Sequence, residues 1–173
     1  DILVSAVDND AARLACALLS TTHCLVQLDV AAGIHRNDQG QRQMEGDVHL
    51  ILPGDRCLLC CGGVCDYDRA LRRLVSEAGS TSTGQSEPWW LQRMGSLKTM
   101  DQAVAGVAAQ LLIDLVASRV QSSVWSRLAW HDDGRFTAER PELAARDTCR
   151  GCLCSRMGLG DAGIMWSGFP QPS

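Results

Sequence analysis

The sequence has 173 residues, enough for one domain, and its 46% apolar and 21% charged residues are typical of a globular chain. Its 16 Lys and Arg against 20 Asp and Glu give a net charge of -4, which leaves no basic surface for nucleic acid. The most apolar stretch, 103–117, is interrupted by Gln110 and Asp114 and is shorter than the ~20 residues of a bilayer span. We therefore expect neither nucleic-acid binding nor a membrane segment.

The beginning of the chain predicts a strand, a helix and a second strand. Residues 2–7 form a nearly continuous apolar run, the pattern of a strand buried on both faces of a parallel sheet. Asp8 ends this run, and the Asp8-Asn9-Asp10 segment offers N-cap residues for a helix over 11–20. A second strand is expected over 24–30. These elements predict an α/β fold.

The middle of the chain gives weaker signals. Residues 33–46 are expected to be a polar turn region that leads into a strand over 48–52. No regular element is predicted over 62–93, and within it 79–92 is rich in Gly, Ser and Thr and is interpreted as a flexible crossover loop.

The last third contains the clearest helix and a hairpin. A long helix is expected from Thr99, with one apolar face made by Val104, Val107, Ala108, Leu111, Leu112, Leu115 and Val116. Residues 120–130 and 135–140 predict a β-hairpin, because the Asp133-Gly134 pair between them supplies the positive φ angle of a tight turn.

Nine cysteines are too many and too clustered to be scattered core thiols. They are Cys16, Cys24, Cys57, Cys60, Cys61, Cys65, Cys149, Cys152 and Cys154. The number is odd and no secretion signal is visible, so we expect a reducing, cytoplasmic location in which the thiolates bind metal or react.

Two CxxC pairs, Cys57/Cys60 and Cys149/Cys152, are the strongest chemical signal in the sequence. A two-residue spacer lets both thiolates of a pair reach one tetrahedral Zn²⁺. The 88 residues between the pairs exclude a compact finger, so the ion would join two distant segments and be structural. Two separate redox dithiols are the alternative, and Cys61 and Cys154 are near enough to act as substitute ligands.

Asp8 and Cys65 are the candidate catalytic residues. A carboxylate at the end of a buried parallel strand lies where open α/β sheets bind ligands, and it could hold Mg²⁺ against nucleotide phosphates. Asp8 or Asn9 could instead only cap the next helix. Cys65 follows Gly62-Gly63 and could be a nucleophile if its pKa were lowered, although buried or spare thiols are commoner.

The segment 158–163 matches GxGxxG but lacks the strand and helix that a dinucleotide site needs on either side. We interpret it as a flexible tail. The four histidines (23, 35, 49 and 131) have no metal-site or triad spacing and are expected to be surface or sheet residues.

Several blocks, taken in order, resemble one known family. They are Val7-Asp8-Asn9-Asp10 with Ala12-Arg13, then 26–33, then 48–54 followed by Cys57-Leu-Leu-Cys60, then Gly95-Ser96-Leu97, and finally Cys149-Arg-Gly-Cys152. Over roughly residues 1–160 the chain resembles the C-terminal half of the HesA/MoeB/ThiF family, the bacterial relatives of ubiquitin-activating enzymes. The resemblance implies a Rossmann-like fold with a mixed sheet, a long helix, a β-hairpin and a structural zinc site.

The resemblance also implies an activity. Such enzymes bind Mg-ATP, and the C-terminal glycine carboxylate of a ubiquitin-like or sulfur-carrier protein attacks the α-phosphate to give an acyl-adenylate and pyrophosphate. Asp8 would hold the magnesium of ATP, Asn9 would belong to the same cofactor site, and Cys57, Cys60, Cys149 and Cys152 would bind zinc. A carrier protein ending in Gly-Gly is the implied partner.

The departures from the family limit this expectation. The glycine-rich nucleotide loop and the basic phosphate contacts of the family's N-terminal half are missing from this sequence. We expect the chain to be inactive alone, and either to be a fragment, to pair with a chain that supplies that half, or to form a homodimer. No Cys occurs between Asp66 and Lys98, which favours adenylation without a thioester. The alternative is a non-catalytic, zinc-stabilised module that binds a ubiquitin-like protein or completes a partner's activating subunit.

Overall fold

The computed structural model describes residues 1–36, 42–79, 98–143 and 152–161. Within them lies one mixed sheet of five strands in the order β1-β2-β3-β4-β5. The strands are β1 (Ile2–Ser5), β2 (Val26–Arg36), β3 (Arg42–Ile51), β4 (Val124–His131) and β5 (Phe136–Glu139). Only β1 and β2 are parallel; every other neighbouring pair is antiparallel.

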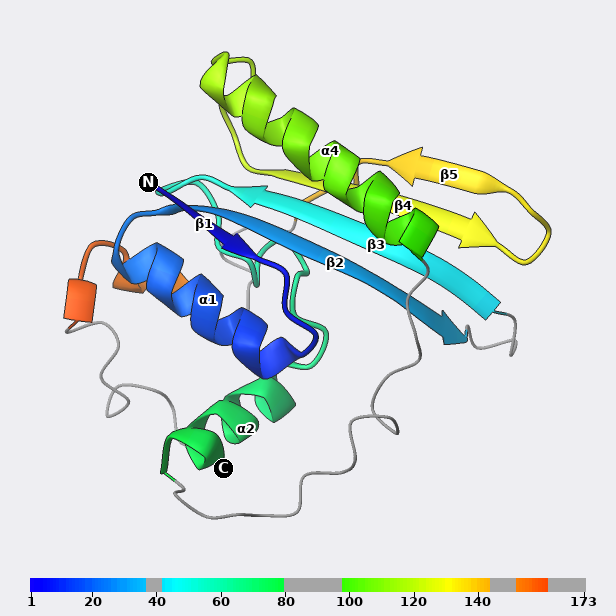
Figure 1. Cartoon of the computed structure of the whole chain (residues 1–173). Helices are drawn as coiled ribbons and strands as arrows, with labels where there is room; N and C mark the ends of the chain where they lie inside the picture. The colour runs from blue at the N-terminus through cyan, green and yellow to red at the C-terminus, as the bar shows by residue number, and fades with distance from the viewer. Residues whose placement is uncertain (37–41, 80–97, 144–151, 162–173) are drawn as a thin grey trace.

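Helices cover both faces of this sheet, so the described part of the chain has three layers. Figure 1 shows α4 (Lys98–Val116) on one face, and α1 (Asp10–Thr22) and α2 (Tyr67–Gly79) on the other. A short 3₁₀ helix, η2 (Leu153–Arg156), lies beside α1. The α/β architecture expected from the sequence is therefore confirmed, with a mixed sheet.

The core is divided by the sheet into two clusters, because successive side chains of a strand point to opposite faces. The α4 side buries Leu28, Val48, Leu50, Met100, Val104, Ala108, Leu111 and Leu128. The α1 side buries Leu14, Ala17, Leu18, Ile51, Cys57, Leu58, Cys60, Cys61, Ala70, Leu71 and Leu153. Four of the members on the α1 side come from the short segment 57–61, so this segment is part of the core.

Most predicted elements are present. The helix over 11–20 and the long helix from Thr99 correspond to α1 and α4, and the strand over 2–7 corresponds to the shorter β1. The expected burial of this strand on both faces is wrong, because β1 lies at the edge of the described sheet and Ile2 and Val4 are 42% and 60% exposed. The predicted hairpin is β4 and β5, and Gly134 has a φ of +80° in the turn between them. The assignment of Val116 to the apolar face of α4 is wrong, because this residue is 81% exposed.

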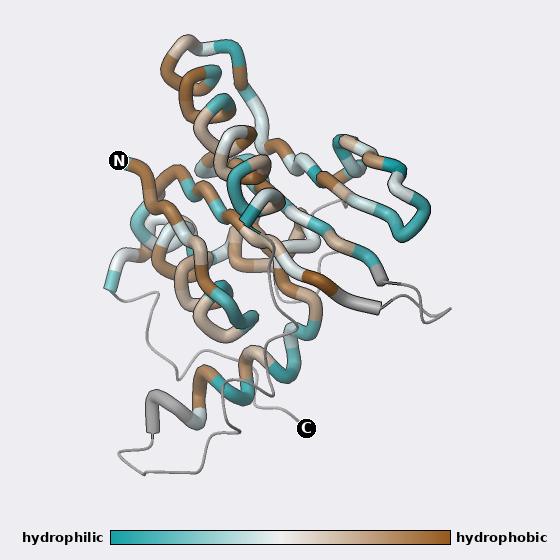
Figure 2. Tube along the Cα trace, turned by 45° about the vertical axis from the view of Figure 1, so that its right-hand side comes forward, coloured by the Kyte–Doolittle hydropathy of each residue, from teal (hydrophilic) through white to brown (hydrophobic). Residues whose placement is uncertain are grey.

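Two expectations for the middle of the chain are wrong. Much of 33–46 is strand, because β2 continues to Arg36 and β3 begins at Arg42, and the two pair antiparallel. Helix α2 lies within the region where no regular element was expected. Its mean hydropathy is low, and Figure 2 shows hydrophilic and hydrophobic positions mixed along it. Among the α2 residues whose burial is described, Ala70 and Leu71 are buried. The predicted crossover loop, 79–92, lies outside the described residues except for Gly79, the last residue of α2.

Helix α4 is longer than the apolar stretch recognised in the sequence. Its 19 residues make it, by length and composition alone, able to span a membrane, in contrast to the shorter apolar stretch 103–117. In the structure this helix packs against β2 and β3, and Met100, Val104, Ala108 and Leu111 are its buried residues. The packing is that of a helix that covers one face of a sheet.

Candidate metal centre

Tight turns after β3 form the first half of the centre. The backbone N–H of Cys61 donates to the carbonyl of Cys57 at 3.3 Å, and that of Gly63 donates to the carbonyl of Leu58 at 3.0 Å. Gly62 has a φ of +71°, and a Cβ atom on Gly63 would collide with the Leu58 side chain, so both glycines are required for this turn. The turn brings Cys57 Sγ to 3.4 Å from Cys60 Sγ.

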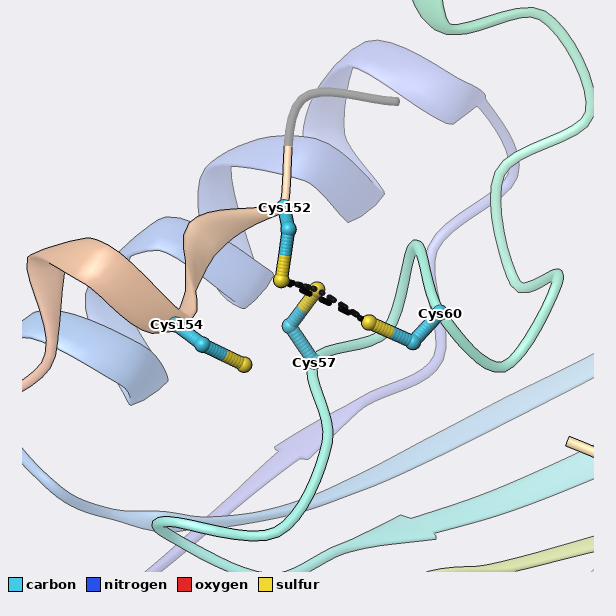
Figure 3. A group of neighbouring side chains, drawn as sticks. All are labelled: Cys57, Cys60, Cys152 and Cys154. Carbon is cyan, nitrogen blue, oxygen red and sulfur yellow. Dashed lines mark hydrogen bonds between the residues drawn. The ribbon is translucent and has the colours of Figure 1, made fainter. Parts of the chain in front are cut away.

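The second half comes from the start of η2. Cys152 is the residue that precedes this 3₁₀ helix, and its Sγ lies 3.9 Å from Cys57 Sγ and 3.6 Å from Cys60 Sγ. Cys154, inside η2, completes a group of four sulfur atoms that all lie within 4.8 Å of one another. Figure 3 shows these side chains converging from the two segments. Two parts of the chain more than 90 residues apart in sequence thus meet at one point.

The four thiols fit a single tetrahedral ion. With Zn–S bonds of ~2.3 Å, the sulfur atoms of a tetrahedral site are about 3.8 Å apart. The three measured S···S distances, 3.4, 3.6 and 3.9 Å, lie close to that value. A set of four thiolates is typical of a structural zinc site, in which no position is left for substrate. The four close cysteines could therefore hold a metal ion such as zinc.

The thiols of the cluster do not ionise alike. Burial raises the pKa of Cys57, which is fully buried. Burial also acts on Cys152, but hydrogen bonds from Cys154 and from the Cys60 and Cys57 thiols outweigh it and lower the pKa of Cys152 to about 7. Because metal ligands must be thiolates, binding of an ion at this cluster would release protons and would therefore depend on pH.

The structure places three of the four predicted ligands together. Cys57, Cys60 and Cys152 converge as expected, and Cys149 lies outside the described residues. Cys154, considered as a substitute from the sequence, is the fourth thiol of the group. Cys61, the other substitute, is buried, and burial followed by the charge of Cys60 raises its pKa to about 12. Its thiol is not one of the four.

Asp8 and Asn9 lie between β1 and α1. Asn9 is the N-cap of α1, and its Oδ1 accepts a hydrogen bond of 2.9 Å from the backbone N–H of Ala12. Asp8 is exposed, and its Oδ1 accepts a hydrogen bond of 3.2 Å from Asn9 Nδ2. The capping role considered from the sequence thus falls to Asn9.

Cys65 lies near α1, at the start of α2. It is exposed, and its backbone N–H donates to Asp10 Oδ2 at 3.1 Å. Partial desolvation, and then the charge of Asp10, raises the pKa of the Cys65 thiol. A raised pKa reduces the thiolate fraction at neutral pH, which is the opposite of what a nucleophilic cysteine needs.

A buried polar row crosses the sheet on its α1 side and was not recognised as a unit in the sequence. In the strand register Ser5 is opposite Asp29, Asp29 is opposite His49, and His49 is opposite Trp125. Ser5, Asp29 and His49 are all at most 2% exposed. An Asp inside the apolar run 26–30 and a His inside the run 48–52 were the available signals, but only the pairing register shows that they meet.

No protein-family model matches the sequence, and no curated protein is significantly similar to it.

Proposed function

We propose that this chain is the carrier-binding, zinc-bearing half of an enzyme that adenylates the C-terminal glycine of a ubiquitin-like or sulfur-carrier protein. The proposal rests on the resemblance of its sequence motifs to the HesA/MoeB/ThiF family. The observation that best supports it is the position of Asp8, an exposed carboxylate between a parallel strand and the N-terminus of α1. That position is where open α/β sheets bind ligands.

In the proposed reaction the carrier's carboxylate attacks the α-phosphorus of ATP. A bond forms between the carboxylate oxygen and phosphorus, and the bond to pyrophosphate breaks, which gives an acyl-adenylate and pyrophosphate. Asp8 contributes a carboxylate oxygen to Mg²⁺, whose preferred ligands are oxygens, and Asn9 holds the Asp8 side chain and the first turn of α1 in place. Positioning and compensation of phosphate charge are the main tasks of such a site.

Zinc has a structural role in this proposal. Cys57, Cys60, Cys152 and Cys154 would hold it, with Cys149 as the other sequence-predicted ligand. The ion would fix the segment that follows β3 against η2, and η2 packs beside α1, whose N-terminus follows Asp8. No chemical step passes through the zinc.

The experiment is ATP–pyrophosphate exchange with the natural form of the protein, including any subunit that co-purifies, and a carrier ending in Gly-Gly. Exchange is expected, and Asp8→Asn should lower it by at least tenfold, because an amide is a poor ligand for Mg²⁺. Asp68→Asn, an exposed substitution in the first turn of α2, is the matched control and should retain exchange. Absence of exchange with every such carrier would refute the adenylation proposal.

The same preparation tests the alternative function. Carrier binding that persists in Asp8→Ala and does not depend on ATP would identify a non-catalytic module that docks a ubiquitin-like protein. Reversible oxidation of the cysteines with little bound metal would indicate a thiol redox protein instead, whereas about one zinc per chain would exclude it.

A further inference from the structure

The glycine turn that follows the first cysteine pair is held from two sides. On one side the carbonyl of Gly63 accepts a hydrogen bond of 3.1 Å from Nη1 of Arg13, on α1. On the other side the indole ring of Trp125, on β4, lies next to Gly62, since a Cβ atom built on Gly62 would be 3.4 and 3.5 Å from two ring carbons. The turn is thus hydrogen-bonded to α1 at Gly63 and bordered by a side chain of the sheet at Gly62.

The two holding residues are connected through the buried polar row. The ring of Trp125 stacks on that of His49, with centroids 5.4 Å apart and planes at 26°. His49 Nδ1 lies 3.6 Å from Asp29 Oδ2, and Arg13 Nε lies 3.5 Å from the same oxygen. The residues from Trp125 through His49, Asp29 and Arg13 thus form a ring that returns to the glycine turn by a hydrogen bond at Gly63 and by the proximity of Trp125 to Gly62.

The polar members of this ring are shielded from water. Asp29 and His49 are 0% and 1% exposed, and the Arg13 side chain is 13% exposed. Arg13 Nε, Asp29 Oδ2 and both ring nitrogens of His49 are buried without a hydrogen-bond partner in the structure. Removal of one partner from a buried ion pair leaves an uncompensated charge, so Arg13 and Asp29 depend on each other.

We infer that this ring, formed by Arg13, Asp29, His49 and Trp125, positions the glycine turn and so preorganises Cys57 and Cys60 for metal binding. The four residues are positioning residues, since none of them is among the four clustered thiols. The turn begins directly after Cys61 and is only two residues from Cys60, so displacement of Gly62 and Gly63 moves the first thiol pair. A loop already held in its bound shape loses less freedom when the ion binds. The inference rests on the zinc centre and is independent of the adenylation step.

The test is zinc affinity measured by competition with a chromogenic chelator, without ATP or carrier. Asp29→Asn and Trp125→Leu are each expected to weaken zinc binding on the order of tenfold, the lower range for residues that support metal ligands without touching the metal. Arg72→Ala is the matched control for charge removal, because Arg72 is an exposed residue of α2 that contacts the carbonyl of Asp68, and it should leave the affinity unchanged.

A reciprocal measurement separates positioning from general destabilisation. Zinc added to the chelator-treated protein should slow amide hydrogen exchange in β3 around His49, and in Asp29→Asn this protection should be reduced although the variant remains folded by circular dichroism. If Asp29→Asn does not fold, the zinc affinity of Trp125→Leu tests the inference. Zinc affinities within twofold of wild type in the folded variants would overturn the inference, as would wild-type protein that binds no zinc. Neither result depends on whether the protein adenylates a carrier.

Discussion

Ser5 on β1 donates a hydrogen bond of 2.7 Å from its Oγ to Oδ1 of Asp29 on β2, and both side chains are buried. The two residues are direct partners in the parallel register. This hydrogen bond satisfies one carboxylate oxygen, while the other oxygen faces Arg13 and His49. The hydroxyl of Ser5 therefore supports the buried carboxylate that Arg13 and His49 face.

Ser5→Ala is expected to lower the free energy of unfolding by roughly 1–3 kcal/mol, the usual effect of leaving a buried polar atom without a partner. Urea unfolding followed by circular dichroism measures it. Ser76→Ala, at an exposed position of α2, is the control and should change the value by less than about 0.5 kcal/mol. Equal effects of the two substitutions would contradict the role given to Ser5.

Gly46 provides a steric test of the contact between β3 and α4. A Cβ atom there would overlap Cγ2 of the buried Val104 and lie 3.3 Å from Sδ of Met100. Gly46→Ala should therefore reduce the free energy of unfolding by about 1–3 kcal/mol through overpacking. Gly33, on the neighbouring strand, has nothing within 4 Å of such a Cβ atom, so thermal unfolding of Gly33→Ala should match wild type. Identical unfolding curves for both variants would mean that α4 does not pack at this position.

The Cys16 thiol is expected to make the free energy of unfolding fall at alkaline pH. Partial burial, and then the charge of Asp29, raises the pKa of this thiol above its ordinary value of 9.0. The unfolded chain therefore releases the proton first, so the stabilising contribution is complete below about pH 9 and is lost as pH rises through the raised folded pKa. With saturating zinc, the decline in unfolding free energy between about pH 8 and pH 10 should be shallower in Cys16→Ala than in wild type. An equal slope in the two proteins would contradict the effect assigned to Cys16.

Periodicity and turn chemistry predicted the outer elements of the fold. The apolar run before Asp8 and the Asp-Gly pair at 133–134 are local signals, and β1 and the β4–β5 hairpin follow from them. The segment 33–46 resembles a turn region because glycines such as Gly33 and Gly46 are typical of turns, although much of it is strand. Gly46 is needed instead where α4 crosses β3 closely, a tertiary requirement that no local pattern reveals.

The candidate metal centre was predictable in its chemistry but not in its full geometry. The CxxC spacing identified Cys57 and Cys60 as a pair, because both ligands lie within one turn. The approach of η2 depends on packing against α1 and could not be derived from spacing. The buried row was missed for a similar reason: Asp29 and His49 become neighbours only through the register of β2 and β3.

Metal content distinguishes the clustered thiols from their neighbour. Cys60→Ser should reduce bound zinc from about one ion per chain to well below half after dialysis, because only three thiols of the cluster remain. Cys61→Ser, at the adjacent position, is the control and should retain the metal, since the Cys61 thiol is not in the group of four. Elemental analysis measures the zinc content of both variants. Loss of zinc in Cys61→Ser alone would show that the proposed set of ligands is wrong.

The fourth ligand can be identified with cobalt in place of zinc. Tetrahedral Co²⁺ bound by four thiolates absorbs through sulfur-to-metal charge transfer, whose intensity follows the number of thiolates. The geometry predicts that Cys154→Ser lowers this intensity by roughly a quarter and weakens cobalt binding, because Cys154 Sγ lies within 4.8 Å of the other three sulfur atoms. Cys149→Ser is measured alongside as the test of the sequence-predicted ligand. A larger loss in Cys149→Ser than in Cys154→Ser would assign the site to the pair of CxxC motifs that the sequence suggests.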